Sequence, residues 1–233
     1  MASLATSSVT SVVTSVVEEI EGDLLDCPNA THVVHQTNCV TRSAKGLAKH
    51  LFAKFPNSNT YKSNDPLRIP GTCSLHPQLI DPSLTVVNLY GQYGPGKKWD
   101  KRRGGPRDDR QARTSYFQMG LEDLGSILQQ KTKTLPPHSP TPHSLPHSSV
   151  SAAAVVAFPF QIGCNLAGGD WTTYRQMIEE FAVRHHAFGV RVLIVRLPLQ
   201  RDIEFHQETS GTKRKKRKKK IKTGGGGGGG GGG

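Results

Sequence analysis

A glycine-rich loop follows a short apolar segment in the second half of the chain. Residues 155–160 read VVAFPF and predict a buried strand, and the loop 163–169 contains three glycines before Asp170 begins a helical pattern. Backbone N–H groups of such a turn, together with the positive end of the following helix, can bind phosphate oxygens. The spacing matches neither GxGxxG nor GxxxxGK[ST]. A phosphate cradle and a structural strand-to-helix turn therefore remain alternatives at this junction.

Two further strand ends carry residues suited to ligand binding. The segment 31–39, THVVHQTNC, predicts a buried strand and is followed by a small-residue loop with Gly46 and then a helix. The segment EIEGDLLD places Asp23 at the end of another strand, where its carboxylate could accept hydrogen bonds from an exocyclic amine. Ligands of α/β sheets bind beyond the carboxyl ends of the strands. The two strand–loop–helix junctions could therefore clamp a ligand from both sides.

Hydrophobic periodicity predicts the elements that position these junctions. We expect strands at the end of 14–22 and in 31–39, 71–80, 83–94, 152–160 and 189–199, and helices in 43–56, 108–130 and 171–188. The order β-β-α-β-β-α-β-α-β predicts an α/β fold, with helices packed on a buried and largely parallel sheet.

Composition divides the 233 residues into one domain and flanking segments. We expect a flexible leader at 1–13, a domain at 14–200 with a disordered Pro/His/Ser-rich insertion at about 131–150, and a disordered tail at 201–233. The run 213–222 holds nine basic residues, so removing it from the net charge of +12 leaves +3 for the rest. The high isoelectric point thus describes the tail and does not indicate a DNA-binding fold.

The cysteines and histidines predict no metal site and no cofactor. The four cysteines at 27, 39, 73 and 164 include no CxxC pair, so we expect free thiols in a reducing, intracellular compartment. The histidines at 138, 143 and 147 lie among prolines, which favours a linker over a metal site. The sequence shows no signal peptide and no apolar run long enough to span a membrane.

Three motifs in order carry a family resemblance. GDLLDCP, HQTNC…GLAKHLFAKFP and PFQIGCNLAGGDW together resemble the macro domain, the ADP-ribose-binding module, from about Glu18 to about Leu199. The nearest branch is related to ADP-ribose 1″-phosphate phosphatases and terminal ADP-ribose hydrolases. The resemblance implies a macro-type three-layer α/β/α sandwich with a central mixed, mostly parallel sheet. It also implies an ADP-ribose cleft at the strand ends, and we expect a monomer.

The resemblance also assigns ligand-binding residues. Asp23 would meet the adenine amine with Leu24 beside it, and Asn38 would bind the distal ribose. Ala44, Gly46 and Leu47 would line the first loop near the diphosphate and the distal ribose. The second loop would wrap the diphosphate with backbone amides of Ile162, Gly163, Cys164, Asn165, Leu166, Ala167 and Gly168.

Catalytic residues follow the family pattern only in part. The deacylating branch uses a lysine after the central strand and an aspartate in the second loop, but Gln92 and Ala167 stand near those places. His35 holds the position of the histidine in the phosphatase branch and could act as a general acid or base. Asp170 could assist, although its place before a helix favours an N-cap role. A structural strand-end histidine is the alternative for His35.

Three functions compete. The leading hypothesis is hydrolysis of a 1″-phosphate or a protein-linked ester from the distal ribose, by a water that Asn38 positions and that His35 or the ligand's own phosphates activate. The second is a non-catalytic reader of ADP-ribosylated proteins or nucleic acids. The third is a polyanion-binding nuclear protein, since the run 213–220 resembles a nuclear-localisation patch and the segment 96–113 holds eight basic residues. A solvated loop is the alternative for 96–113.

Overall fold

The computed structural model describes residues 16–62, 68–97, 104–133 and 154–198. The chain divides into two units, Met1–Arg196 and Leu197–Gly233, and the fold below is that of the first. The leader, nearly all of the predicted insertion and the basic tail lie outside the described residues. The corresponding predictions therefore stay predictions.

Six strands form one mixed sheet in the order β1-β6-β5-β2-β4-β3. Every neighbouring pair is parallel except β3 and β4, which run antiparallel. The strands are β1 (Val17–Glu21), β2 (His32–Asn38), β3 (Cys73–Pro77), β4 (Thr85–Gln92), β5 (Val155–Pro159) and β6 (Arg191–Arg196). All eight residues of β4 are buried, as expected for a central strand of a sheet that is covered on both faces.

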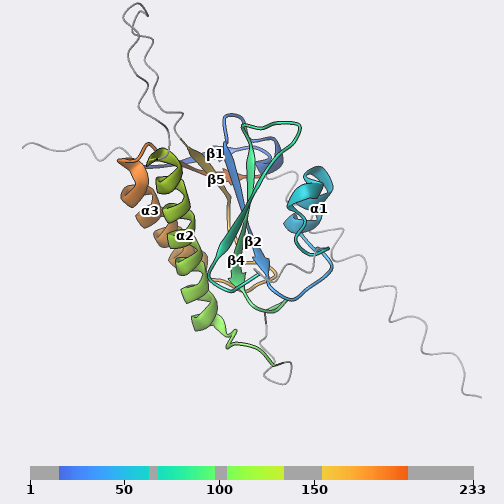
Figure 1. Cartoon of the computed structure of the whole chain (residues 1–233). Helices are drawn as coiled ribbons and strands as arrows, with labels where there is room; N and C mark the ends of the chain where they lie inside the picture. The colour runs from blue at the N-terminus through green and yellow to red at the C-terminus, as the bar shows by residue number, and fades with distance from the viewer. Residues whose placement is uncertain (1–15, 63–67, 98–103, 134–153, 199–233) are drawn as a thin grey trace, which may run out of the picture. The chain divides into compact units, whose positions relative to one another are not determined.

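Three α-helices cover the sheet, with α1 on one face and α2 and α3 on the other (Figure 1). They are α1 (Leu47–Lys54), α2 (Arg110–Lys133) and α3 (Trp171–His186), and two 3-10 turns, η1 (Leu24–Asp26) and η2 (Pro56–Ser58), complete the order. The predicted element order and the three-layer α/β/α sandwich are both confirmed. The second predicted helix begins two residues later than expected, because Asp109 caps it by accepting from the Ala112 N–H at 2.9 Å.

The two layers of core follow the helical stripes of the sequence. In α2 the side chains of Phe117, Leu121, Leu124 and Leu128 are all buried. The Phe117 ring stacks on Tyr174 of α3 with ring centroids 4.1 Å apart. In α1, Leu51 and Phe52 pack on the opposite face of the sheet. Because helices cover both faces of the sheet, the sheet itself can contact a ligand only through the ends of its strands and the loops that follow them.

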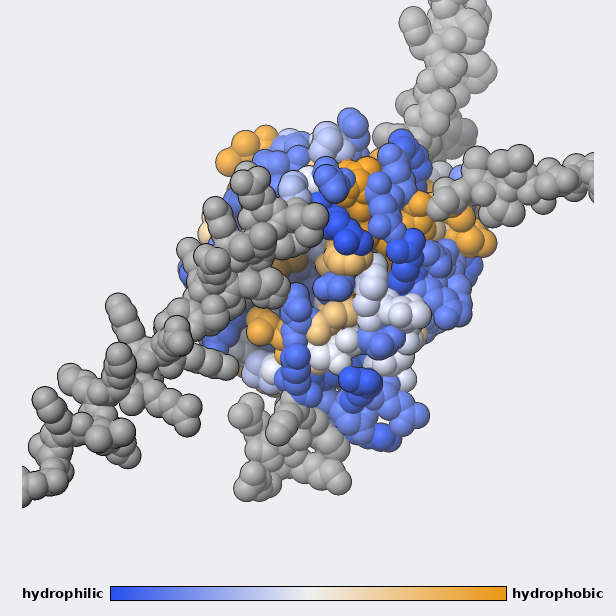
Figure 2. Space-filling view, turned by 180° about the vertical axis from the view of Figure 1, so that it is seen from behind, coloured by the Kyte–Doolittle hydropathy of each residue, from blue (hydrophilic) through white to orange (hydrophobic). Residues whose placement is uncertain are grey.

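Three loops meet at the carboxyl edge because the strands that precede them are parallel. We name them the first loop (39–46, after β2), the β4 loop (93–97) and the glycine loop (160–170, after β5). Since β5, β2 and β4 are consecutive in the sheet, these loops are neighbours. In the view of Figure 2 the described surface is largely hydrophilic, and its apolar side chains form separate groups. No helix of the described ranges is long and apolar enough to cross a membrane.

Candidate functional site

The glycine loop is folded tightly over the end of β2. Gly163 and Gly168 have φ angles of +71° and +73°, in the left-handed region that favours glycine. The Gly169 N–H donates to the Gly163 carbonyl at 3.0 Å, which closes the loop on itself. A Cβ at Gly163 would lie only 2.1 Å from Oε1 of Gln36. The loop therefore needs a glycine at 163 for its conformation and for its close approach to β2.

Gln36 of β2 packs against the glycine loop at Gly163, a role that the sequence analysis missed. Its Nε2 donates to Oε1 of Gln92 at 3.0 Å, and the Gln92 Nε2 donates to the Gly94 carbonyl at 2.8 Å. Among the residues that the structure describes, the buried Oε1 of Gln36 has no hydrogen-bond partner. Gln92 thus joins β2 to the β4 loop through neutral amides.

Asn38 organises the first loop. Its Oδ1 accepts from the backbone N–H groups of Val40 at 3.3 Å and Thr41 at 2.8 Å, and its Nδ2 donates to the Tyr61 hydroxyl at 2.9 Å. The side chain is buried. These bonds hold the first turn after β2 in place. Contact between Asn38 and a ribose stays a prediction.

The first loop and the glycine loop touch each other, as the predicted clamp requires. Gly46 has a φ of +56°, and a Cβ there would lie 3.1 Å from Cδ1 of Leu166. Within the glycine loop, Asn165 and Leu166 are exposed, whereas Ile162 and Ala167 are buried.

The remaining predicted ligand residues lie along the same edge. Asp23 caps η1 by accepting from the Leu25 N–H at 3.0 Å. Leu24 is buried in the core on the α1 side, and Ala44 and Leu47 pack partly against that core. Leu24 is therefore part of the hydrophobic core, and its contact with a ligand stays a prediction.

His35 lies in the core of this structure, and a catalytic role for it stays a prediction. The side chain is 1% exposed, packs edge-on against Phe52 and bonds through Nε2 to Oδ1 of Asn88 at 2.5 Å. Burial lowers the pKa of His35 to about 4, so the ring is neutral near pH 7. Asn88 also donates to the Ser58 carbonyl at 2.8 Å. His35 is therefore a structural residue that joins β2 to β4.

Asp170 caps α3. Its Oδ1 accepts from the backbone N–H and from the hydroxyl of Thr173, both at 2.9 Å. The hydrogen bonds from Thr173 lower the pKa of Asp170 and keep the carboxylate ionised. The N-cap role, favoured from the sequence, is confirmed, and a catalytic role has no geometric support.

A buried ion pair joins the β4 loop, α2 and the glycine loop, and the sequence analysis missed it. Asp108 accepts from the N–H groups of Tyr93 at 2.8 Å and Gly94 at 2.9 Å, and it bonds Arg113 through both oxygens. Arg113 also donates to the carbonyl of Ala167 at 2.8 Å. The side chains of Asp108 and Arg113 are 1% and 3% exposed. This pair therefore holds the glycine loop at Ala167 next to α2 and the β4 loop.

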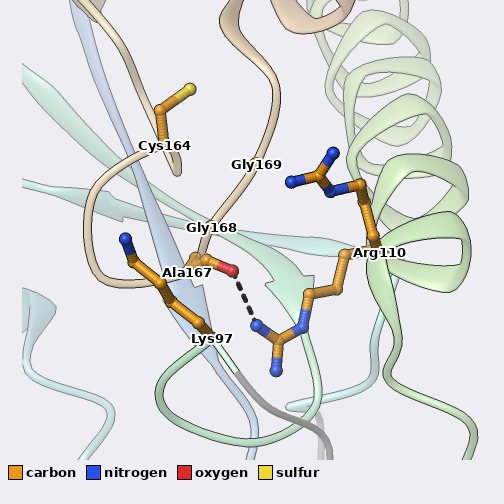
Figure 3. A pocket seen from close by; sticks show the side chains of 7 residues that line it. Lys97, Arg110, Cys164, Ala167, Gly168 and Gly169 are labelled. Atoms are coloured by element: carbon orange, nitrogen blue, oxygen red, sulfur yellow. Dashed lines mark hydrogen bonds between the residues drawn. The ribbon is translucent and has the colours of Figure 1, made fainter.

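A cationic pocket of about 320 Å³ lies beside that ion pair (Figure 3). Its wall is the 167–169 segment with Cys164, and its charged side chains are Lys97, Arg110 and Arg113. Burial raises the pKa of the Cys164 thiol to about 11, which argues against a nucleophilic cysteine. Burial also raises the pKa of Cys39, to about 12. In the described part of the chain, no three His, Cys, Asp or Glu side chains are grouped as a metal site would need.

Comparisons with known proteins give a likeness of fold. No protein-family model matches the sequence, and the search of curated proteins gave no match. A protein of unknown function from Bacteroides thetaiotaomicron is 22% identical, with a TM-score of 0.52 over 78% of this chain and 98% of that chain.

Macrodomain structures from Oceanobacillus iheyensis are also similar. One with MES bound is 14% identical, with a TM-score of 0.49 over 86% of this chain and 93% of that chain. A mutant of that macrodomain with ADPR is 13% identical, with a TM-score of 0.49 over 85% and 94%. At 22% identity the likeness to the Bacteroides protein concerns the fold alone, and TM-scores below 0.5 give no further information about this chain.

Arg113→Gln should destabilise the protein strongly, because it leaves the Asp108 carboxylate buried without its partner. We expect a loss of about 3–5 kcal/mol in the free energy of unfolding, measured by denaturant titration. The matched control is Arg107→Gln, which removes the exposed pair with Asp109 and should cost far less stability, because solvent screens that pair. Equal losses in the two variants would show that the buried pair has no special role.

His35 should make the fold sensitive to mild acid. Its pKa is lowered to about 4 in the folded chain but is near 6.5 when unfolded, so the unfolded state takes up the proton first as pH falls. This contribution to stability is complete above pH 6.5 and is lost progressively between pH 6.5 and 4, about 3 kcal/mol in all. Unfolding free energies measured across this range should fall less steeply in His35→Leu. Parallel profiles for the two proteins would rule this contribution out.

Proposed function

We propose that this chain binds ADP-ribose along the carboxyl edge of its sheet. The adenine would lie near Asp23, the diphosphate on the glycine loop, and the distal ribose near Asn38. The observation that carries the proposal is the order of these features along the edge. Asp23 follows β1, the glycine loop follows β5 and Asn38 ends β2, and the sheet order there is β1-β6-β5-β2.

The spacing of the strands suits an elongated ligand of this kind. Neighbouring strands lie about 4.8 Å apart, so β1 and β2 are separated by roughly 14 Å along the edge. A base at one end, a diphosphate in the middle and a sugar at the other end match the three positions in sequence. The glycine loop, with positive φ at Gly163 and Gly168, offers main chain without bulky side chains where the diphosphate would lie.

Recognition without hydrolysis is the form of this function that the geometry favours. The two residues predicted to be catalytic are engaged elsewhere, since His35 is buried against Asn88 and Asp170 caps α3. The lysine and the aspartate of the deacylating branch are not matched in this sequence, where the corresponding positions are near Gln92 and at Ala167. A reader of ADP-ribosylated proteins or nucleic acids needs only the cleft. A nuclear location, suggested by 213–220, stays a prediction because that run lies outside the described residues.

ADP-ribose binding should depend on Gly163. We expect the full-length chain to bind ADP-ribose in calorimetric titrations, and Gly163→Ala to weaken binding roughly tenfold or more, because a Cβ would collide with Gln36 and move the loop. Gly104→Ala is the matched control. Gly104 also has a positive φ, +68°, but a Cβ there would meet nothing within 4 Å.

The salt dependence separates the cleft from the basic tail. Binding in the cleft should change little as salt rises, whereas binding by the run 213–222 should collapse. No heat of binding at near-millimolar ADP-ribose, in a wild-type chain that melts cooperatively, would refute the proposal.

Turnover should be absent. Incubation of the full-length chain with ADP-ribose 1″-phosphate, and separately with an ester-linked ADP-ribosyl peptide, should release neither phosphate nor free ADP-ribose over an uncatalysed control. Repeated turnover of either substrate would contradict the reader function and support hydrolysis. Retained turnover in His35→Leu would then point to activation by the ligand's own phosphates.

A further inference from the structure

The cations beside β1 are neutralised by carboxylates of that strand. Glu18 pairs with Arg191 of β6. Glu19 pairs with Arg175 of α3 and with Arg196 of β6. This side of the sheet, where the adenine would lie, therefore carries little uncompensated positive charge.

The chain that follows β2 is cationic instead. Residues 39–62 contain five Lys or Arg residues and neither Asp nor Glu. Lys54 pairs with Asp26 of η1. Lys45 and Lys49 are exposed, and within the described ranges neither side chain makes a hydrogen bond or an ion pair. The side of the sheet where the distal ribose would lie therefore carries uncompensated positive charge.

Lys45 and Lys49 belong to the segment that borders the proposed cleft. Lys45 precedes Gly46, where a Cβ would lie 3.1 Å from Cδ1 of Leu166 in the glycine loop. The Lys49 N–H donates to the Gly46 carbonyl at 3.0 Å. Asn38, near which the distal ribose would lie, accepts from two backbone N–H groups at the start of the same first loop. Both lysines are therefore next to the distal-ribose end of the cleft.

The charge of Lys49 does not stabilise its own helix. Lys49 lies in the first turn of α1, and that turn holds no acidic residue. Because the N-terminal end of a helix is electropositive, a cation there is unfavourable. Leu51 and Phe52 supply the apolar contacts that hold α1 on the sheet. The lysine charge therefore requires an explanation other than folding.

We propose that the carrier of the ADP-ribose group is a nucleic acid, whose phosphate backbone lies over Lys45 and Lys49. This inference rests on the ADP-ribose binding proposed above. A carrier joined through the distal ribose continues from the cleft over the first loop. A nucleic acid brings a negative charge on every nucleotide whatever its sequence, and lysine binds phosphate as a point charge without a fixed geometry. A protein carrier brings no fixed charge to this place.

The test uses the full-length chain with all nine Lys and Arg residues of 213–222 replaced by Gln, so that the tail charge does not contribute. Calorimetric titrations compare free ADP-ribose with two conjugates. One is a single strand of about four nucleotides with ADP-ribose on its terminal phosphate. The other is an acidic peptide of the same net charge with ADP-ribose on a serine. We expect the nucleic-acid conjugate to bind about tenfold tighter than free ADP-ribose. The peptide conjugate should gain less, because its carboxylates end flexible side chains that lose entropy on binding.

Two double variants of this chain locate the contact. K45Q/K49Q should bind free ADP-ribose as its parent does and should lose most of the gain of the nucleic-acid conjugate. Each phosphate contact on a single strand contributes about 0.7 to the slope of log K against log salt, so this variant should reduce the slope by about 1.4. The matched control R184Q/R191Q removes the same charge from exposed positions on α3 and β6 and should keep the full gain.

Three results would overturn this inference alone while free ADP-ribose still binds. They are equal affinities for the nucleic-acid conjugate and free ADP-ribose, equal losses in the two double variants, and a peptide conjugate that binds as tightly as the nucleic-acid conjugate or more tightly. The last result would indicate an acidic protein as the carrier. If free ADP-ribose does not bind at all, the proposed function and this inference both fail, so the two kinds of failure are distinguishable.

Discussion

The buried pair of Asp108 and Arg113 determines the shape of the carboxyl edge. Removing two charges from water is costly, and the cost is offset only when every polar atom finds a partner. Here the carboxylate accepts from two backbone N–H groups of the β4 loop, and the guanidinium donates to carbonyls of that loop and of the glycine loop. Two loops that follow different strands, together with the first turn of α2, are thus set by one interaction.

The parallel strands bring segments that are distant in the sequence to the same edge of the sheet. β5 lies more than a hundred residues after β1 and β2 in the sequence, yet the carboxyl ends of all three strands point the same way. Asp23, the glycine loop and Asn38 therefore line one edge although more than a hundred residues separate the first from the second. Hydrogen bonds from Gln36 to Gln92 and from Gln92 to Gly94 join β2, β4 and the β4 loop at this edge.

Most of the fold could be predicted from the sequence because its elements have clear periods. Apolar stripes such as Phe117, Leu121, Leu124 and Leu128 indicate a helix in any context, and β-branched runs bounded by turns indicate buried strands. The site was less predictable. His35 looked catalytic from its place before Asn38, but its burial depends on Phe52 of α1 and on Asn88 of a neighbouring strand, and no local pattern reports either.

Within the basic segment 96–113, Asp108 and Arg113 have a structural role that the sequence does not indicate. Its charges suggested a solvated loop or a phosphate contact, and Asp108 and Arg113 looked like ordinary members of it. Their five-residue separation is not a helical pairing distance, so the sequence gives no sign that the two side chains are buried together. Only the packing of the β4 loop against the glycine loop separates this structural pair from the exposed charges around it.

The contact between Gly163 and Gln36 has a consequence for how this sequence can evolve. The two positions are 127 residues apart, yet a single methyl group at 163 would occupy the place of the Gln36 carboxamide. A side chain at 163 would need both a smaller residue at 36 and a tolerated φ of +71°, and the smaller residue at 36 would remove the link to Gln92. Among relatives of this chain, we therefore expect positions 36, 92 and 163 to vary together or not at all.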